Sequence, residues 1–415
     1  MFFYRYLNKV VFSHENYVLG NEISEEEAMK EKDIIYYLTK RETGKYNRTF
    51  CLSHGSLFNL PEENLDLLNI VNVENERKIP QWLVEKINRR QLQWVNTNYP
   101  DWESILDMKP KNKWRINIAG LGDVGGILLS GLRLMGGDIV ESIGIFDIDT
   151  NKVNRWLMEA GQIMSPDEDA QHPEVVAISK DELFDCDMFV FTVSIGVPSL
   201  TSSHSDVRMA QYGGNSKIIS EYAREARNRN FKGIFAVVSD PVDLLCKKAL
   251  IESNTNGHGV IDYKGLGPDQ VRGYGLGVMR ARAAYHATKM GLGKTFARLG
   301  RAYGPHGKGL VIADNIENYD DKTSVMLTEM ALKSNMDVRS TGFKPYIAPA
   351  LSSGALSILA TINGQWHYSA VFLGGVYFGC RNRLNPSGTE LERINIPSDL
   401  MARIKESYNS LGGME

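Results

Sequence analysis

The sequence has few cysteines and no long apolar run, and these absences exclude whole classes of protein. Its four cysteines among 415 residues are scattered, without the close spacing of zinc ligands or redox pairs. We therefore expect free or buried thiols in a reducing compartment and no metal site. No stretch of 18 apolar residues occurs, and Arg5 and Lys9 interrupt the aromatic N-terminus. Neither a membrane span nor a secretory leader is predicted, and a cytoplasmic location is expected.

An excess of charge of one sign is also missing. The 47 Lys and Arg residues nearly balance the 50 Asp and Glu residues, for a formal net charge of −3. Without a basic field, neither nucleic acid nor an anionic membrane surface is an expected partner. No internal repeat is evident, and the length is sufficient for two or three domains with ample core.

What the sequence does contain is a dinucleotide-binding pattern within residues 113–149. An apolar strand (114–119) leads into a glycine loop, Gly-Leu-Gly-Asp-Val-Gly-Gly (120–126). A helix-compatible stretch and a second strand (142–146) follow, and that strand ends on Asp147. A lone glycine motif is weak evidence, but strand, loop, helix, second strand and acid in this order predict a bound dinucleotide.

Each residue of the glycine loop has a physical role. Gly120 allows the tight turn, Gly122 lets backbone N–H groups approach a pyrophosphate, and Gly125 lets the helix pack closely on the sheet. Asp123 and Val124 lie between these glycines and belong to the same predicted cofactor site. Phosphates would then sit at the N-terminus of the helix, where unpaired N–H groups and the helix dipole favour negative charge.

Asp147 indicates which of the two nicotinamide dinucleotides, NAD or NADP, is bound. It lies about twenty residues beyond the glycine loop, where an acid accepts hydrogen bonds from a ribose diol and repels a 2′-phosphate. The sequence therefore predicts NAD rather than NADP.

Three domains are expected. Residues 1–112 read as a small α+β module without a catalytic constellation, in which His14 and His54 are surface or loop residues. Its predicted elements are strands over 2–12 and 34–38 and helices over 25–32 and 79–94. A polar segment, residues 109–113, closes the module.

Residues 113–274 alternate strand and helix, which predicts a doubly wound parallel sheet of the Rossmann type within an α/β fold. Its six strands are expected at 114–119, 142–146, 175–178, 188–193, 234–238 and 271–274. Residues 275–415 read as a C-terminal α+β domain, with the reaction in the crevice between the two. Its predicted elements are helices over 280–289 and 315–333, an antiparallel meander over 366–375, 376–384 and 391–396 with a turn at 385–388, and a helix from Pro397 to about 407.

Four segments together resemble the lactate/malate dehydrogenase family. They are the glycine loop with Asp147, Val-Ser-Ile-Gly-Val-Pro (193–198), Ser-Asp-Pro-Val-Asp (239–243) and Gly-Pro-His-Gly (304–307), in family order. The resemblance covers roughly residues 113–411, about three quarters of the chain, and the first 112 residues have no counterpart in it. It adds Ser194 and Gly196 to the expected cofactor site and implies a homo-oligomer acting on a small anionic substrate.

The resemblance also implies catalytic roles. Arg208, seven residues before Asn215, matches the mobile-loop arginine that polarises the substrate carbonyl. Arg282 matches the arginine that grips the substrate carboxylate through a planar two-pronged contact. His306 matches the proton-transferring histidine. Taken singly, the two arginines could be solvated helix charges and the histidine a turn residue; in combination and in order, the functional interpretation is favoured.

The departures from the family pattern leave the catalytic interpretation open. Met279 stands where the family carries the aspartate that orients the histidine, and Asp240 stands where an asparagine is usual. Residues 199–207 contain no arginine, Lys308 replaces an acid, and Arg280 adds a cation beside Met279. In one hypothesis, Asp240 orients His306 or meets a cationic group on the substrate, and the protein is an NAD-dependent 2-hydroxy acid dehydrogenase.

In a second hypothesis the catalytic pair has decayed, and the protein is an NAD-binding sensor or scaffold whose N-terminal module contacts a partner. A structural protein that binds no nucleotide conflicts with the intact glycine loop. The substrate itself cannot be named from the sequence.

Overall fold

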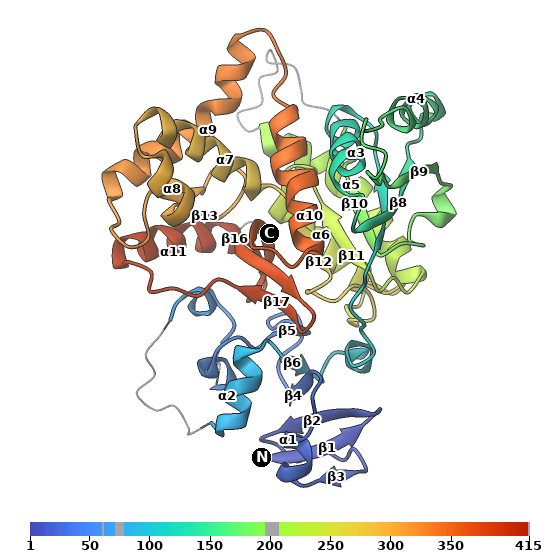
Figure 1. Cartoon of the computed structure of the whole chain (residues 1–415), viewed down its shortest axis with the longest axis vertical. Helices are drawn as coiled ribbons and strands as arrows, with labels where there is room; N and C mark the ends of the chain where they lie inside the picture. Colours follow the sequence, from blue (N-terminus) through green and yellow to red (C-terminus); the bar gives the residue numbers. More distant parts are fainter. Residues whose placement is uncertain (60–61, 71–78, 196–206, 414–415) are drawn as a thin grey trace.

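The fold is built around one nine-stranded sheet that is parallel on one side and antiparallel on the other (Figure 1). The computed structural model describes residues 1–59, 62–70, 79–195 and 207–413, with the backbone alone described for 59 and 207–210. The strand order is β17-β16-β15-β12-β11-β10-β7-β8-β9. No helix in these ranges is long and apolar enough to cross a membrane.

Six parallel strands form the predicted doubly wound half of the sheet. They are β7 (Trp114–Ala119), β8 (Val140–Phe146), β9 (Glu174–Ala177), β10 (Met188–Phe191), β11 (Ile234–Val237) and β12 (Val271–Gly273). In chain order they lie 3-2-1-4-5-6, so the winding reverses between β7 and β10, and ligands of such sheets bind at the carboxyl ends of these strands. The predicted α/β fold class is confirmed.

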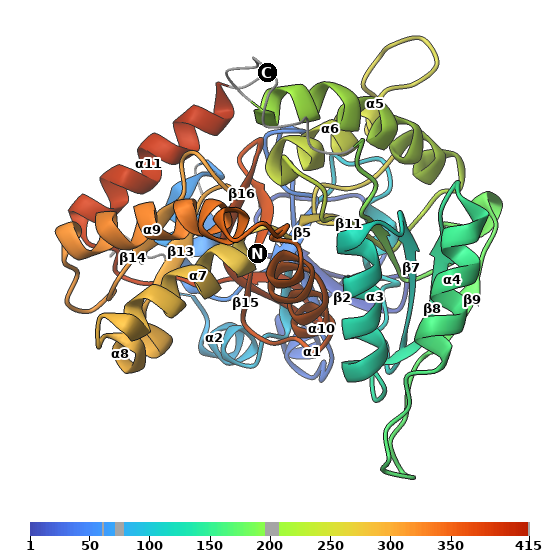
Figure 2. The same ribbon diagram turned by 90° about the horizontal axis from the view of Figure 1, so that it is seen from above.

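Helices cover both faces of this half, which is why its central strands β10 and β11 are continuously apolar rather than alternating. On one face lie α3 (Asp123–Met135), α4 (Thr150–Gly161) and, later in the chain, α10 (Leu356–Ile362). On the other lie α5 (Val207–Asn228) and α6 (Val242–Asn254). Seen from above, α10 runs beside α3 (Figure 2).

The antiparallel half is the predicted meander, with one correction. It comprises β15 (His367–Leu373), β16 (Val376–Asn385) and β17 (Gly388–Leu391), and β15 pairs with β12 through Ala370 and Gly273. The third strand was expected at 391–396 but begins at Gly388, because Asn385 already pairs with Gly388 across a two-residue turn. The sheet thus runs across the predicted boundary at residue 274, and the division into three domains stays a prediction.

The rest of the C-terminal part consists of helices, a two-stranded sheet and a π-helix. They are α7 (Leu276–Lys289), α8 (Gly293–Leu299), β13 (Arg301–Tyr303), β14 (Val311–Ala313), α9 (Asp321–Ser340), the π-helix η5 (Pro349–Ala355) and α11 (Ser398–Gly412). The helix expected at 315–333 begins later, since the Asp320 side chain caps it by accepting from Thr323 N at 2.8 Å.

Residues 1–112 form a second, mixed sheet. Its order is β3-β1-β2-β4-β6-β5, from β1 (Phe2–Tyr6), β2 (Lys9–Ser13), β3 (Glu22–Ile23), β4 (Ile35–Thr39), β5 (Thr49–Cys51) and β6 (Leu92–Asn96), with helices α1 (Glu25–Met29) and α2 (Gln81–Asn88). The single strand expected at 2–12 is a hairpin that turns at Leu7 and Asn8, both with positive φ.

The predicted helix over 79–94 is half wrong. It ends at Asn88, and Arg90 has a left-handed φ of 57° that redirects the chain. The segment that follows is β6, because Leu92–Asn96 pairs with β4 on one side and β5 on the other and every one of its residues is buried. Helical spacing alone could not reveal those two partners.

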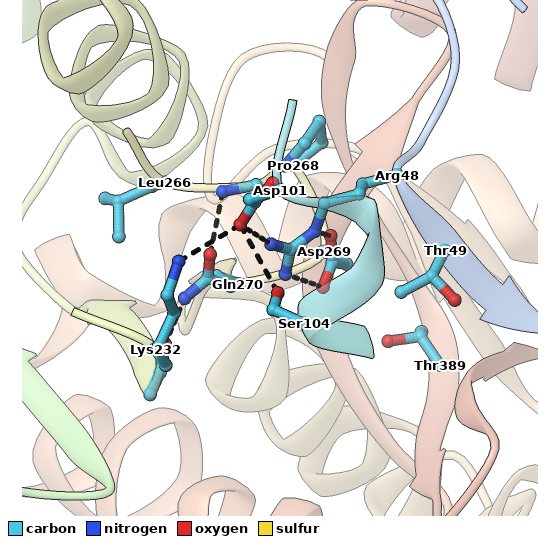
Figure 3. Close-up of polar contacts among 12 residues, drawn as sticks. Arg48, Thr49, Asp101, Ser104, Lys232, Leu266, Pro268, Asp269, Gln270 and Thr389 are labelled. Carbon is cyan, nitrogen blue, oxygen red and sulfur yellow. Dashed lines mark hydrogen bonds and ion pairs between the residues drawn. The ribbon is translucent and has the colours of Figure 1, made fainter. Parts of the chain in front are cut away.

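The N-terminal sheet shares a core with the C-terminal elements. One apolar cluster holds Leu57 and Leu68 together with Phe378, Leu400 and Ile404. At the same junction, buried Arg48 donates to Asp269 at 3.0 and 2.9 Å and to Asp101 at 2.6 Å (Figure 3).

A cavity of about 30 Å³ lies at this junction, lined among others by Thr49, Asp269 and Arg393. Its volume suits water rather than a substrate. None of the predicted site residues lines it.

Candidate functional site

The glycine loop between β7 and α3 has the stereochemistry that the motif predicts. Gly120 has φ +99°, and a Cβ there would lie 2.8 Å from the Val193 backbone N. A Cβ on Gly125 would lie 2.0 Å from the Gly120 carbonyl O. A Cβ on Gly122 would meet nothing within 4 Å. Two glycines are therefore required by the fold itself, whereas the third faces open space.

The N-terminus of α3 is available to an anion. Gly122 is its N-cap and supplies no side-chain hydrogen bond to the first turn, in which Asp123 and Val124 follow. Thr192 at the end of β10 donates to the carbonyls of Ala119 and Gly120 at 2.9 and 2.6 Å, which fixes the loop against the next strand. The uncapped N–H groups beside an open glycine fit the phosphates of a dinucleotide.

Asp147 sits at the end of β8 against the glycine loop. Its Oδ2 accepts from Leu121 N at 2.7 Å and its Oδ1 from Asp149 N at 3.0 Å. The Lys152 ammonium lies 3.7 Å from Oδ1, and the Asp147 side chain is 8% exposed. The acid therefore orders the loop, a role that sequence reasoning missed, and each oxygen keeps lone-pair capacity for a further donor.

The segment after β10 is described only in part. Ser194 is exposed, and Ile195 N donates to the Asn215 side chain at 3.1 Å. Gly196 lies outside the described residues. The backbone of Arg208 lies in the first turn of α5, and its side chain is outside the described part.

The structure brings His306 and Asp240 into contact. His306 Nδ1 lies 2.8 Å from Asp240 Oδ1. The histidine side chain is 15% exposed and the carboxylate 40% exposed. His306 belongs to the turn between β13 and β14, and Asp240 follows β11, so the pair joins the carboxyl edge of the parallel sheet to the C-terminal elements.

The turn that carries His306 is held from several sides. Gly304 has φ +87°, and its N–H donates to the Gly379 carbonyl of β16 at 2.9 Å. The Ser407 hydroxyl of α11 donates to the Gly309 carbonyl at 2.6 Å. A Cβ on Gly275, at the start of α7, would lie 2.8 Å from the His306 Cβ. Three separate elements therefore fix the position of the imidazole.

Asn215 of α5 is a further site residue that sequence reasoning missed. It is fully buried, and its Nδ2 donates to the Asp240 carbonyl at 2.8 Å while its Oδ1 accepts from Ile195 N. One side chain thus ties α5 to the segments that follow β10 and β11. The only available signal was its distance of seven residues from Arg208, which corresponds to about two helical turns.

The position that the family gives to the orienting aspartate is apolar in this chain. Met279 of α7 is 1% exposed within a hydrophobic cluster. Its sulfur lies 3.4 Å from Nη1 of Arg282, which follows on the same helix. A charge on residue 279 would therefore have to be buried among apolar groups.

This arrangement suits proton transfer. An imidazole paired through Nδ1 with a carboxylate is fixed in orientation, and its Nε2 can then give or take a proton. Burial raises the pKa of the Cys246 thiol on α6 well above its ordinary value, which disfavours the thiolate that a nucleophile needs. No group of metal-ligating side chains occurs among the described residues.

The fold and the glycine loop define a doubly wound α/β protein of the Rossmann type. No family model matches the chain. Over 172 residues, or 41% of this chain, it is 27% identical to an L-lactate dehydrogenase of Oceanobacillus iheyensis, and it spans about half (47%) of that relative's length.

Solved structures show the same fold over a longer stretch. A minor L-lactate dehydrogenase from Enterococcus mundtii is 17% identical with a TM-score of 0.60, covering 73% of this chain and 97% of its own. Malate dehydrogenase from Plasmodium falciparum is 15% identical with a TM-score of 0.57, covering 72% of this chain and 96% of its own. The chain has the fold of lactate and malate dehydrogenases, and the resemblance predicted from the motifs is confirmed at modest sequence identity.

Proposed function

We propose that this protein is an NAD-dependent oxidoreductase that transfers a hydride between nicotinamide and a 2-hydroxy or 2-oxo acid. The observation that carries the proposal is the 2.8 Å contact between His306 and Asp240. Proton transfer to the substrate oxygen needs an oriented acid–base group, and this pair provides one at the carboxyl edge of the sheet. The intact pair argues against a decayed site.

Asp240 takes the orienting role that Met279 cannot fill. With Nδ1–H donated to the Asp240 carboxylate, Nε2 is the nitrogen that holds the proton for a 2-oxo acid or accepts it from a 2-hydroxy acid. The carboxylate also stabilises the imidazolium when the ring is protonated, as in a serine-protease triad. The carboxylate thus comes from the segment after β11 instead of from α7.

The substrate would be anionic and small. By the family resemblance, Arg282 grips the substrate carboxylate and Arg208 polarises the carbonyl. Because residues 199–207 supply no arginine, a second carboxylate on the substrate lacks the cation that malate dehydrogenases use. A monocarboxylic 2-oxo acid is therefore favoured.

A nicotinamide dinucleotide fits the residues present and would supply the hydride donor or acceptor. Gly120, Gly122 and Gly125 would admit its pyrophosphate to the N-terminus of α3, and Ser194 lies at the neighbouring strand end. Asp147 would accept from the ribose diol while keeping its contacts to the loop, which favours NAD over NADP. A homo-oligomer and a cytoplasmic location stay predictions.

The test is an assay of NADH oxidation by the purified protein against a panel of 2-oxo acids, with His306→Ala as the matched variant. We expect turnover with at least one monocarboxylic 2-oxo acid. The variant should lose about 10²–10⁴-fold in kcat with unchanged NADH affinity. Tight NADH binding without turnover on any member would contradict the proposal and favour the sensor or scaffold.

A further inference from the structure

The connection from α9 to η5, residues 341–348, brings a cation to the glycine loop from the C-terminal part of the chain. Lys344 Nζ lies 3.2 Å from Oδ2 of Asp123, the first residue of α3. The two side chains are 77% and 52% exposed, so both are accessible from solvent. The partners are 221 residues apart in sequence.

Close packing of small residues fixes where this connection runs. A Cβ on Gly131 of α3 would lie 2.6 Å from the Ala355 Cβ and 2.9 Å from Leu351. A Cβ on Gly354 would lie 2.7 Å from Leu128 of α3. The π-helix η5 therefore lies against α3, and both views show α10, which continues it, beside α3 (Figures 1 and 2). The segment with Lys344 leads into this contact.

Lys344 lies where a positive charge would offset the negative charges expected at the cofactor site. A dinucleotide pyrophosphate carries two negative charges, and Asp123 adds a third at the helix end where the pyrophosphate would bind. That repulsion is costly unless a cation offsets it. Residues 199–207 contain no arginine to do so.

We propose that Lys344 is a cofactor ligand that exchanges Asp123 for the dinucleotide pyrophosphate on binding. This inference rests on the proposed function, since it concerns the same cofactor site. Before binding, the ion pair holds the ammonium beside the loop. After binding, the ammonium contributes a charge-assisted hydrogen bond to a phosphate oxygen.

The test is calorimetric titration of NADH, ADP-ribose and adenosine into the unaltered protein and four variants. The variants are Lys344→Gln, Asp123→Asn, the double variant, and the control Lys333→Gln, which removes another exposed, paired lysine on α9. Lys344→Gln should weaken NADH and ADP-ribose by about 10-fold and leave adenosine unchanged. Asp123→Asn should tighten both by about 3-fold. Lys333→Gln should change nothing.

The double variant distinguishes a direct contact between Lys344 and phosphate from neutralisation of the Asp123 charge. If Lys344 touches phosphate, its loss still weakens NADH in the Asp123→Asn background. If the effect of Lys344→Gln vanishes there, the lysine only neutralises Asp123 and the proposal is overturned. Normal NADH affinity in Lys344→Gln would overturn this inference alone. Absence of NADH binding by the unaltered protein would overturn the proposed function as well.

Discussion

The glycine loop and the histidine turn are the two parts of the proposed site, and they are specified in different ways. The loop depends on backbone stereochemistry within a few residues, such as the left-handed Gly120 and the close approach at Gly125. The His306–Asp240 pair joins side chains 66 residues apart. Local constraint can be predicted from a motif, whereas contact between distant side chains follows only from the fold.

The largest effect on the glycine loop is expected from one methyl group added at Gly125. The Cβ of Gly125→Ala would lie 2.0 Å from the Gly120 carbonyl, so loop and helix must move apart. We expect a loss of about 1–3 kcal/mol in the free energy of unfolding, with NADH affinity lost as well. Denaturant unfolding measures the first effect. A stability equal to that of the unaltered chain would show that the loop is looser than its contacts indicate.

The same methyl group at Gly122 should separate binding from folding. Its Cβ meets nothing within 4 Å, so Gly122→Ala should leave the unfolding free energy within about 0.5 kcal/mol, apart from a small gain in backbone rigidity. NADH affinity should fall by about 10-fold, because the methyl occupies the space in front of the helix N-terminus. Unchanged affinity measured by calorimetry would mean that the phosphates lie elsewhere.

Sequence analysis captured the parallel sheet and the loop because both follow from local patterns. The central strands β10 and β11 are continuous apolar runs, and the resemblance placed His306 and Asp240 in the site. The sequence alone could not establish that His306 and Asp240 touch. It also did not reveal the roles of Asn215 and Lys344, whose partners are distant in the chain. The error over 79–94 has the same origin, since β6 exists only because β4 and β5 flank it.

Glu63 is a buried carboxyl group at the junction of the N-terminal module with the large sheet, and its environment also depends on the fold rather than on a motif. It is 4% exposed, its Oε2 accepts from Asn47 N at 2.7 Å, and burial raises its pKa to about 8. In the unfolded chain the group titrates near 4.5. The folded state therefore binds the extra proton between these values, and stability should fall as pH rises from about 4.5 through about 8.

Glu63→Gln should remove this pH dependence, because the amide does not titrate. Between pH 5 and pH 8.5, the unfolding free energy of the unaltered chain should fall by on the order of 2–4 kcal/mol more than that of the variant. Urea unfolding at the two pH values measures it. Parallel pH curves for the two proteins would show that Glu63 titrates normally.

Centrally, we propose that Asp240, and not residue 279, supplies the carboxylate that orients His306. Asp240→Asn keeps the shape and a hydrogen-bond acceptor but removes the charge that stabilises the imidazolium. With the best 2-oxo acid and saturating NADH, kcat should fall by at least about 100-fold while NADH affinity stays within about twofold. A kcat within about threefold of the unaltered protein would contradict the claim.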